Sequence, residues 1–160
     1  MRPIRDVVLA AERGEEAPLL AWLAGGGRVD ATYERGGVSG ITLLMSAANN
    51  GHERVVELLL QHGADVNLQD SVGWTALMFA AIFNRPAVVR RLLRAGADAA
   101  PTSDGKTALQ WAKKQGHAEC VRALVDHAAA EASAEAAARG AERAAAEAEA
   151  ARHAEALLAE

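Results

Sequence analysis

One segment of the sequence occurs nearly three times along the chain. Its copies begin at Gly40, Gly73 and Gly105, so the two spacings differ by a single position. Threonine, leucine and alanine follow each of these glycines at nearly constant offsets. A repeat with a fixed period of roughly 33 residues indicates a solenoid, in which each unit packs only on its neighbours. The three copies lie at 40–67, 73–100 and 105–128.

The segment at 40–67, GITLLMSAANNGHERVVELLLQHGADVN, resembles the ankyrin repeat almost letter for letter. The pattern of that family is G-x-T-P-L-H-x-A-A-x-x-G-H-x-x-V-V-x-L-L-L-x-x-G-A-D-V-N. The resemblance implies an all-α solenoid of helix-turn-helix units with short hairpin-like tips, and a noncatalytic role in binding another protein. The chain departs from the pattern where the family has proline and then histidine after the threonine. The histidine often forms hydrogen bonds between units, which are not expected here. The proline is replaced by Leu43, Ala76 and Ala108, and the histidine by Met45, Met78 and Gln110.

Several residues of the repeat have a direct structural explanation at the start of a helix or at the bend between two helices. Each unit has a threonine just before an apolar-periodic run, where its side chain can accept hydrogen bonds from free backbone N–H groups and cap the first helix. Gly51 and Gly116 allow the bend between the two helices of a unit, and Asn84 tolerates the same left-handed conformation. The capping threonines are Thr42, Thr75 and Thr107.

A degenerate unit precedes these three, since residues 7–30 align with 44–67. Terminal units are usually atypical because their outer face meets water. Trp22 falls at an apolar stripe position and is expected in the core. Tyr33 lies in a lengthened loop, where it is either a packed strut or an exposed contact. The predicted array is therefore residues 1–127, with units at about 4–36, 37–70, 71–103 and 104–127.

The array is followed by an Ala/Glu-rich tail at 128–160. More than half of its side chains are Ala and none is Pro, and only Gly140 interrupts a composition of very high helix propensity. The fourth unit also lacks the glycine that ends its second helix in the others. We therefore predict one long helix from near Ala118 to Leu158, of about 60 Å at 1.5 Å per residue.

Trp74, Ile82 and Phe83 place large apolar side chains on the surface that partners of ankyrin repeats usually bind. In that family this surface is the concave face, formed by the turn tips and the exposed side of the first helices. An exposed apolar patch with a polar rim is the expected form of a binding hot spot. The alternative is that Trp74 folds over the neighbouring tip and Phe83 fills the gap between adjacent helices. The predicted partner-binding residues are Ile41, Asn49, Asn50, Trp74, Met78, Ile82, Phe83, Lys106 and Lys114.

No sequence pattern favours catalysis. No two of the five histidines lie at metal-ligand spacing with a carboxylate, and no glycine-rich loop precedes a helix with Lys-Ser/Thr. Cys120, the only cysteine, takes a position held by Val55 and Val88 in other units, so we expect a buried structural thiol. His52 and His117 match the Gly-His of the family, which helps to order the start of the second helix. We therefore predict no enzyme activity, no cofactor and no metal site.

The net charge of −4 belongs to the tail, which contains seven Glu and three Arg, whereas residues 1–127 contain 14 positive and 14 negative side chains. A neutral body argues against a nucleic-acid partner. The chain has no apolar run of the length that a membrane span needs, and acidic residues follow the short apolar patch of its N-terminus. Both features argue against a membrane span and a secretory signal. We expect an intracellular, cytoplasmic monomer, with the nucleus or an organelle interior as alternatives and with any self-association through the tail.

Two functions follow from these surfaces. The main hypothesis is an adaptor, scaffold or inhibitor that binds a partner protein through the concave face. The alternative is a structural or assembly subunit docked through its C-terminal helix, with Leu157 and Leu158 as the anchor. The tail could equally be solvated, or could fold back on the array. Asn67, in GADVN, resembles the asparagine that is hydroxylated in some ankyrin proteins, which is a side hypothesis.

Overall fold

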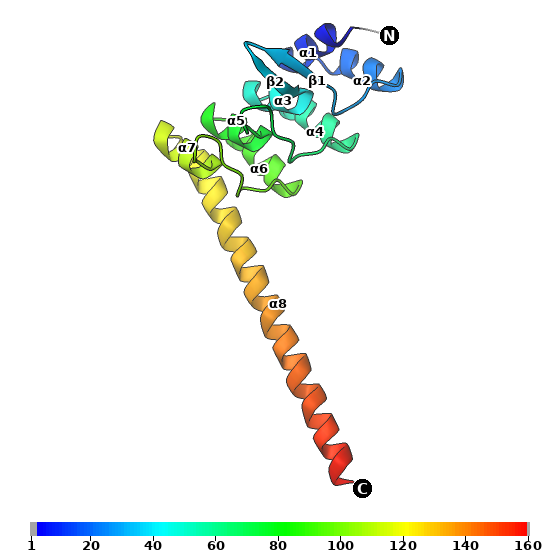
Figure 1. Ribbon diagram of the computed structural model, residues 1–160, viewed down its shortest axis with the longest axis vertical. Coiled ribbons are helices and arrows are strands. Elements are labelled where there is room, and N and C mark those ends of the chain that lie inside the picture. Colours follow the sequence, from blue (N-terminus) through cyan, green and yellow to red (C-terminus); the bar gives the residue numbers. More distant parts are fainter. Residues whose placement is uncertain (1–2, 160) are drawn as a thin grey trace. The chain divides into compact units, whose positions relative to one another are not determined.

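The computed structural model describes residues 3–159. The chain divides into two compact units, the first ending at Val125 and the second beginning at Asp126. Figure 1 shows the helices and strands in chain order. They are α1 (Ile4–Arg13), α2 (Glu16–Ala24), β1 (Thr32–Arg35), β2 (Val38–Thr42), α3 (Leu43–Asn50), α4 (Glu53–Gln61), α5 (Ala76–Ile82), α6 (Pro86–Arg94), α7 (Ala108–Gln115) and α8 (Ala118–Leu158).

The helices of the first unit form two layers. The first helix of each repeat packs on the first helix of the next, in the order α1, α3, α5 and α7, and α2, α4 and α6 pack in the same order beside them. The beginning of α8 completes the fourth repeat with the buried residues Cys120, Ala123 and Leu124. This arrangement confirms the predicted all-α solenoid with a long C-terminal helix. The strands β1 and β2 form an antiparallel hairpin at the first tip, with Tyr33 opposite Ile41.

The predicted helix caps are confirmed. The hydroxyl oxygens of Thr42, Thr75 and Thr107 each accept a hydrogen bond from the backbone N–H three residues later, at 3.1, 3.3 and 3.3 Å. In each repeat that has a capping threonine, the residue at the bend between the two helices has a left-handed backbone conformation. Its φ angle is 74° at Gly51, 57° at Asn84 and 72° at Gly116.

The core consists of small and branched side chains between the two layers. The valines of α4 and α6 are buried together with Leu58, Leu59, Leu92 and Leu93, and so is Cys120, which is 0% exposed. Its thiol lies 3.9 Å from the backbone oxygen of Ala80. Burial raises the pKa of the Cys120 thiol. The cysteine is therefore the structural thiol that was expected.

One side chain from each of the last three repeats bonds to the repeat before it. His52 Nε2 lies 2.6 Å from the Glu12 backbone oxygen, and His117 Nε2 lies 3.0 Å from that of Ile82. In the repeat between them Arg85 takes the same place and donates from Nε to the Asn49 oxygen at 3.2 Å. The sequence assigned these histidines only to the start of their own second helix, whereas the structure shows that they also join successive repeats.

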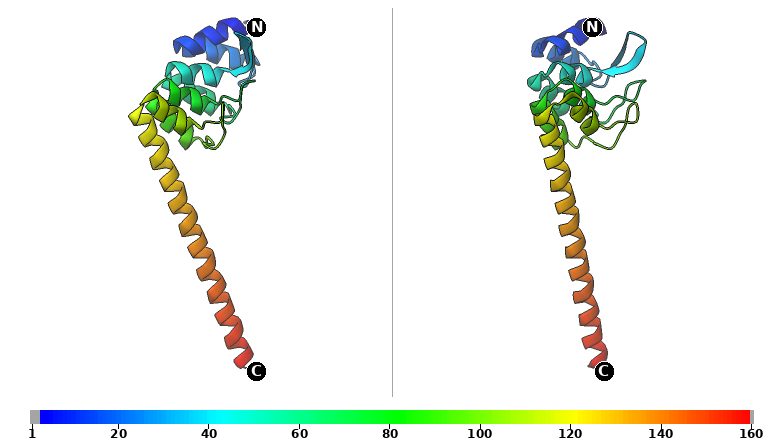
Figure 2. Two further views of the ribbon diagram at one scale, coloured as in Figure 1. Left: turned by 60° about the vertical axis from the view of Figure 1, so that its left-hand side comes forward. Right: turned by 90° about the vertical axis from the view of Figure 1, so that its left-hand side faces the viewer.

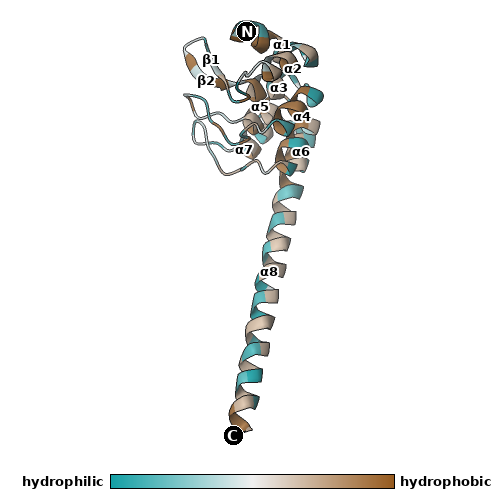
Figure 3. Ribbon diagram, turned by 90° about the vertical axis from the view of Figure 1, so that its right-hand side faces the viewer, coloured by the Kyte–Doolittle hydropathy of each residue, from teal (hydrophilic) through white to brown (hydrophobic). Residues whose placement is uncertain are grey.

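The second unit is the continuation of α8 beyond Val125. This confirms the prediction that the last helix runs from Ala118 to Leu158, and Gly140 lies within it. Two ion pairs form between residues four apart along this helix, at 3.9 Å for Glu135 and Arg139 and 2.9 Å for Arg143 and Glu147. Figure 3 shows polar and apolar residues alternating along it, with the most apolar stretch at its C-terminal end. Within residues 3–159, no helix has the length and apolar composition to cross a membrane.

Candidate functional site

The concave side of the first unit lies between the first helices of the repeats and the tips. Figure 2 shows the β1–β2 hairpin and the later tip loops projecting to one side of the helices. Two cavities open there, of about 190 Å³ and about 310 Å³. They share four residues, so we treat them as one surface and call it the groove. The smaller cavity is lined by Glu12, Tyr33, Arg35, Ile41, Met45, Ser46, Asn49, Asn50, Phe79 and Phe83, and the larger by Arg35, Val38, Ile41, Asp70, Val72, Trp74, Phe79 and Phe83.

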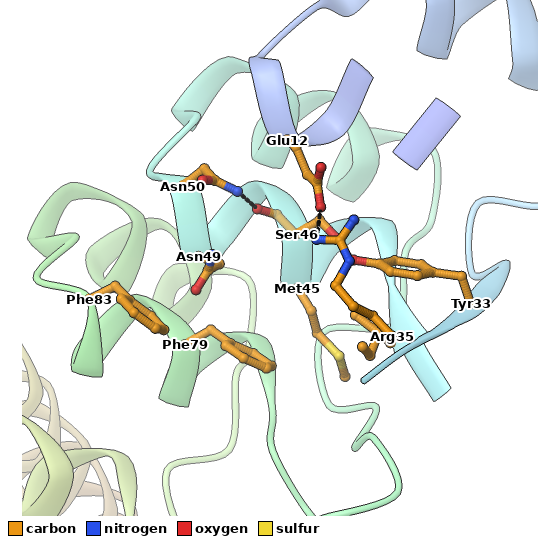
Figure 4. Close-up of a pocket in the computed structure, with 10 residues that line it drawn as sticks. Glu12, Tyr33, Arg35, Met45, Ser46, Asn49, Asn50, Phe79 and Phe83 are labelled. Atoms are coloured by element: carbon orange, nitrogen blue, oxygen red, sulfur yellow. Dashed lines mark hydrogen bonds and ion pairs between the residues drawn. The ribbon is translucent and has the colours of Figure 1, made fainter. Parts of the chain in front are cut away.

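A polar network closes the N-terminal end of the groove, and Figure 4 shows its members converging from α1, β1 and α3. Arg35 forms an ion pair with Glu12 and lies over the ring of Tyr33, 5.5 Å from its centroid. The Tyr33 hydroxyl and the Ser46 hydroxyl are 2.6 Å apart. Burial raises the pKa of Tyr33. Of the two roles left open for Tyr33, the structure shows the packed one.

The middle of the groove is apolar. Phe83, at the end of α5, is 50% exposed, and Val72, in the adjacent tip, is 53% exposed. Ile41 and Phe79 are partly buried beneath them. Large apolar side chains are seldom left exposed side by side unless they contact something else. This part of the groove therefore has the character of a binding surface.

Trp74 is held firmly at the edge of this apolar region. The buried Asp70 carboxylate accepts hydrogen bonds from the backbone N–H groups of Val72 and Trp74 at 3.0 and 2.9 Å, and this fixes the tip. The Trp74 ring packs on Phe79 and on Trp111, with centroids 5.2 and 5.3 Å apart. Trp74 therefore both lines the groove and joins the third repeat to the fourth.

Next to Trp74, outside the lining of the two cavities, lies a basic and aromatic cluster that we take as the C-terminal end of the groove. The ammonium groups of Lys106 and Lys114 each lie 5.3 Å from the centroid of the Trp111 ring. Trp111 is only 9% exposed, and its indole N–H is buried without a hydrogen-bond acceptor among the described residues. An unsatisfied buried donor costs about 1–3 kcal/mol. Trp111 therefore packs inside the array.

The structure brings together most of the predicted partner-binding residues. Ile41, Trp74 and Phe83 line the larger cavity, and Asn49 and Asn50 line the smaller one. The two lysines flank Trp111 as described above. The side chain of Ile82 is partly buried and lines neither cavity.

The prediction that Met78 contacts a partner is wrong. Its side chain is 1% exposed, so it belongs to the core and cannot contact a partner directly. Its equivalent Met45 is also 1% exposed, whereas Gln110, the third residue after the capping Thr107, is exposed. At the next position along the helix, Ser46 and Phe79 line the groove, and comparing the repeats at that offset could have found Phe79.

Asn67 is engaged within the array. Its side-chain oxygen accepts the backbone N–H of Asp98 at 2.8 Å, and its side-chain N–H donates to the Gly96 oxygen at 3.4 Å. These bonds join the second repeat to the third. Its hydroxylation stays a hypothesis.

Between residues 3 and 159, no group of three His, Cys, Asp or Glu side chains is placed to hold a metal ion. The groove instead offers apolar contact in its middle and charged or polar contact at its two ends. These are the elements of a surface for recognising another chain.

Comparison with known proteins agrees with this reading of the fold. Residues 7–103 match the profile of ankyrin repeats in three copies, and residues 104–135 match that of a single ankyrin repeat. The chain is 43% identical over 81 residues to the E3 ubiquitin-protein ligase XBAT33 of Arabidopsis thaliana, a match covering 49% of this chain and 16% of the relative.

Two further relatives have different activities in their names. The chain is 40% identical over 100 residues to the mitochondrial disaggregase of Bos taurus, covering 62% of this chain and 15% of the relative. It is 38% identical over 91 residues to the RelA-associated inhibitor of Mus musculus, covering 54% and 11%. The chain thus spans a small part of the length of these relatives. Because the repeat profiles match well over half of its residues, the chain belongs to the ankyrin-repeat family.

Proposed function

We propose that this protein is a noncatalytic interaction module that binds another protein in the groove. The observation that carries the proposal is the exposure of Phe83 and Val72, 50% and 53%, beside an apolar cavity of about 310 Å³. Burying such side chains against a partner is favourable by about 25 cal/mol for each Å² of apolar surface removed from water. The rigid tip around Trp74 presents this surface in one conformation, which lowers the entropy lost on binding.

The relatives support a recognition role rather than a shared reaction. Their names include a ligase, a disaggregase and an inhibitor, and each match covers 16% or less of the relative's length. A fold that occurs with such different activities does not itself specify the chemistry. We therefore assign the repeats the role of adaptor, scaffold or inhibitor. The cytoplasmic location stays a prediction.

The test uses affinity capture by the full chain from a cell extract, with mass-spectrometric identification of what is retained. Phe83→Glu is the informative variant, because Phe83 is exposed and its replacement leaves the core intact. Trp74→Ala is less suitable, since the Trp74 ring packs on Phe79 and Trp111. Leu20→Glu on α2 is the matched control, because Leu20 is 44% exposed and lines neither cavity of the groove. Equal capture by the two variants would refute the groove as the binding surface.

A second candidate is an assembly subunit docked through the C-terminal helix. The observation that favours it is the exposure of Leu157 and Leu158, 62% and 88%, at the end of a helix that is rich in alanine. Truncation after His127 and the double change Leu157→Ala/Leu158→Ala test it. If the helix carries the function, both changes should abolish capture while Phe83→Glu leaves it intact.

A further inference from the structure

We propose that the segment bound in the groove is an acidic peptide, with a large apolar anchor in the cavity beside Phe83 and a carboxylate at Lys106 and Lys114. The inference rests on the proposed function, since it names the chemistry of the partner that the groove would hold. It is carried by the charges and the unmet hydrogen bond at the C-terminal end of the groove.

The basic charge at this end is uncompensated. Within the described residues neither Lys106 nor Lys114 forms an ion pair. The helix α7, ALQWAKKQ, contains no acidic residue. Asp104, in the same tip as Lys106, is exposed, and among the described residues it pairs with neither lysine. Two cations that share one aromatic ring leave a position where an anion would be attracted to both.

The acidic groups nearer the middle of the groove are already engaged. Asp70 is 7% exposed and accepts two backbone hydrogen bonds, so its carboxylate is committed to the tip. Glu12 is paired with Arg35 at the opposite end. A basic partner would therefore find no free carboxylate among the described residues that line the two cavities, and next to them it would face the unpaired cations Lys106 and Lys114. An acidic partner meets complementary charge.

The unpartnered indole N–H of Trp111 is a second observation that points to an acceptor. The ring lies against Trp74 and under the two lysines, whose side chains are long and rotatable. A carboxylate that draws one lysine away from the ring would pair with its ammonium group and bring an acceptor oxygen to the indole. A carboxylate can accept from both donors at once because it has two oxygens.

The geometry also sets the spacing of the peptide. Trp74 lines the apolar cavity, and its ring centroid lies 5.3 Å from that of Trp111. The Trp111 centroid lies a further 5.3 Å from each lysine ammonium group. An extended chain rises about 3.3 Å per residue, so the acidic residues belong about two or three positions from the apolar anchor. The cavity of about 310 Å³ has room for one leucine or phenylalanine side chain.

The test measures binding of four fluorescein-labelled synthetic peptides to the full chain by fluorescence anisotropy. The first peptide carries a central Phe-Leu pair flanked on each side by three Glu. In the others all Glu are replaced by Gln, all Glu are replaced by Lys, or the Phe-Leu pair is replaced by Ala-Ala. We expect the Glu peptide to bind at least tenfold more tightly than the Gln peptide, and its affinity to fall as salt is raised.

The variants connect this preference to the two lysines. Lys106→Glu/Lys114→Glu should weaken the Glu peptide at least tenfold and make the Lys peptide the tighter ligand. Arg90→Glu/Arg94→Glu is the matched control, because it reverses two exposed charges on α6, away from the groove. Circular dichroism and the melting temperature establish that each variant is folded. In ¹⁵N-labelled protein the Glu peptide should shift the Trp111 indole N–H signal, assigned with Trp111→Phe, more than that of Trp22.

The outcomes separate the two proposals. If the Glu and Gln peptides bind equally and Phe83→Glu abolishes both, the groove binds a partner but acidic recognition is refuted. If no peptide binds, or if Phe83→Glu changes nothing, the groove itself is refuted as well. Self-association of the full chain that Lys106→Glu/Lys114→Glu abolishes, and that blocks the Glu peptide, would assign the groove to a second copy and overturn the acidic-partner proposal.

Discussion

The Asp70 carboxylate accepts the backbone N–H of Trp74 at 2.9 Å, and the Asp70 N–H in turn donates to the Trp74 backbone oxygen, also at 2.9 Å. The two residues thereby close the tip from both sides. The carboxylate is 7% exposed, so its hydrogen bonds are shielded from water. This pairing fixes the backbone from which the Trp74 side chain extends. The Trp74 ring in turn lies between the apolar cavity and the basic end of the groove.

Asp70→Ala should lower the free energy of unfolding by about 2 kcal/mol, since it removes a charged acceptor from two partly buried backbone donors. Asp70→Asn keeps one acceptor oxygen and should cost about half as much. Urea unfolding followed by circular dichroism measures both. A loss no larger for Ala than for Asn would show that the carboxylate does not hold the tip.

The hydrogen bond from Arg85 to the Asn49 backbone oxygen joins the second repeat to the third. Arg85→Ala should remove it and cost about 1 kcal/mol in the free energy of unfolding. Arg85→His should be close to neutral, because His52 and His117 make the same contact from the equivalent position of the neighbouring repeats. Unfolding curves of the two variants provide the comparison, and equal destabilisation by Ala and His would contradict the assigned role.

Much of the fold could be predicted because the repeated residues act locally, within the helix or bend where they lie. A threonine before an apolar run caps a helix wherever it occurs, and the left-handed bend needs Gly51, Gly116 or a tolerant residue such as Asn84. The groove was harder to predict. Phe79 was missed because the repeats were compared at the last residues of the first helix rather than at the offset of Ser46 and Trp111. Each residue turns a helix by about 100°, so a shift of one position also placed Met78 on the wrong face.

The polar end of the groove had no comparable signal. Tyr33 and Arg35 belong to a stretch that has no counterpart in the other repeats, so no alignment could place them. Their positions depend on the pairing of β1 with β2 and on Glu12, which lies in a helix much earlier in the chain. Likewise, the sequence does not show that Lys106 and Lys114 meet over one ring, because one comes from a tip and the other from the end of α7.

Gly140 is the residue of lowest helix propensity in the second unit. Nothing lies within 4 Å of a Cβ built at this position, so alanine fits without strain. Gly140→Ala should stabilise this stretch of α8 by about 1 kcal/mol and slow amide hydrogen exchange in residues 126–158. Exchange in α1 to α7 should not change. Mass spectrometry of the exchanging protein measures both, and unchanged exchange around residue 140 would contradict a helix weakened at the glycine.

Cys120 gives the stability a defined pH dependence. Burial raises the pKa of its thiol above the ordinary value of 9.0, so the unfolded chain loses this proton at a lower pH than the folded protein does. The contribution of the neutral thiol to stability is complete below the unfolded pKa, and it is lost as the pH rises through the folded value. Cys120→Val removes this dependence while keeping the side chain found in two other repeats, Val55 and Val88. Between pH 8 and pH 10 the native protein should therefore lose more stability in urea than the variant does, and parallel curves for the two proteins would show that the thiol is not responsible.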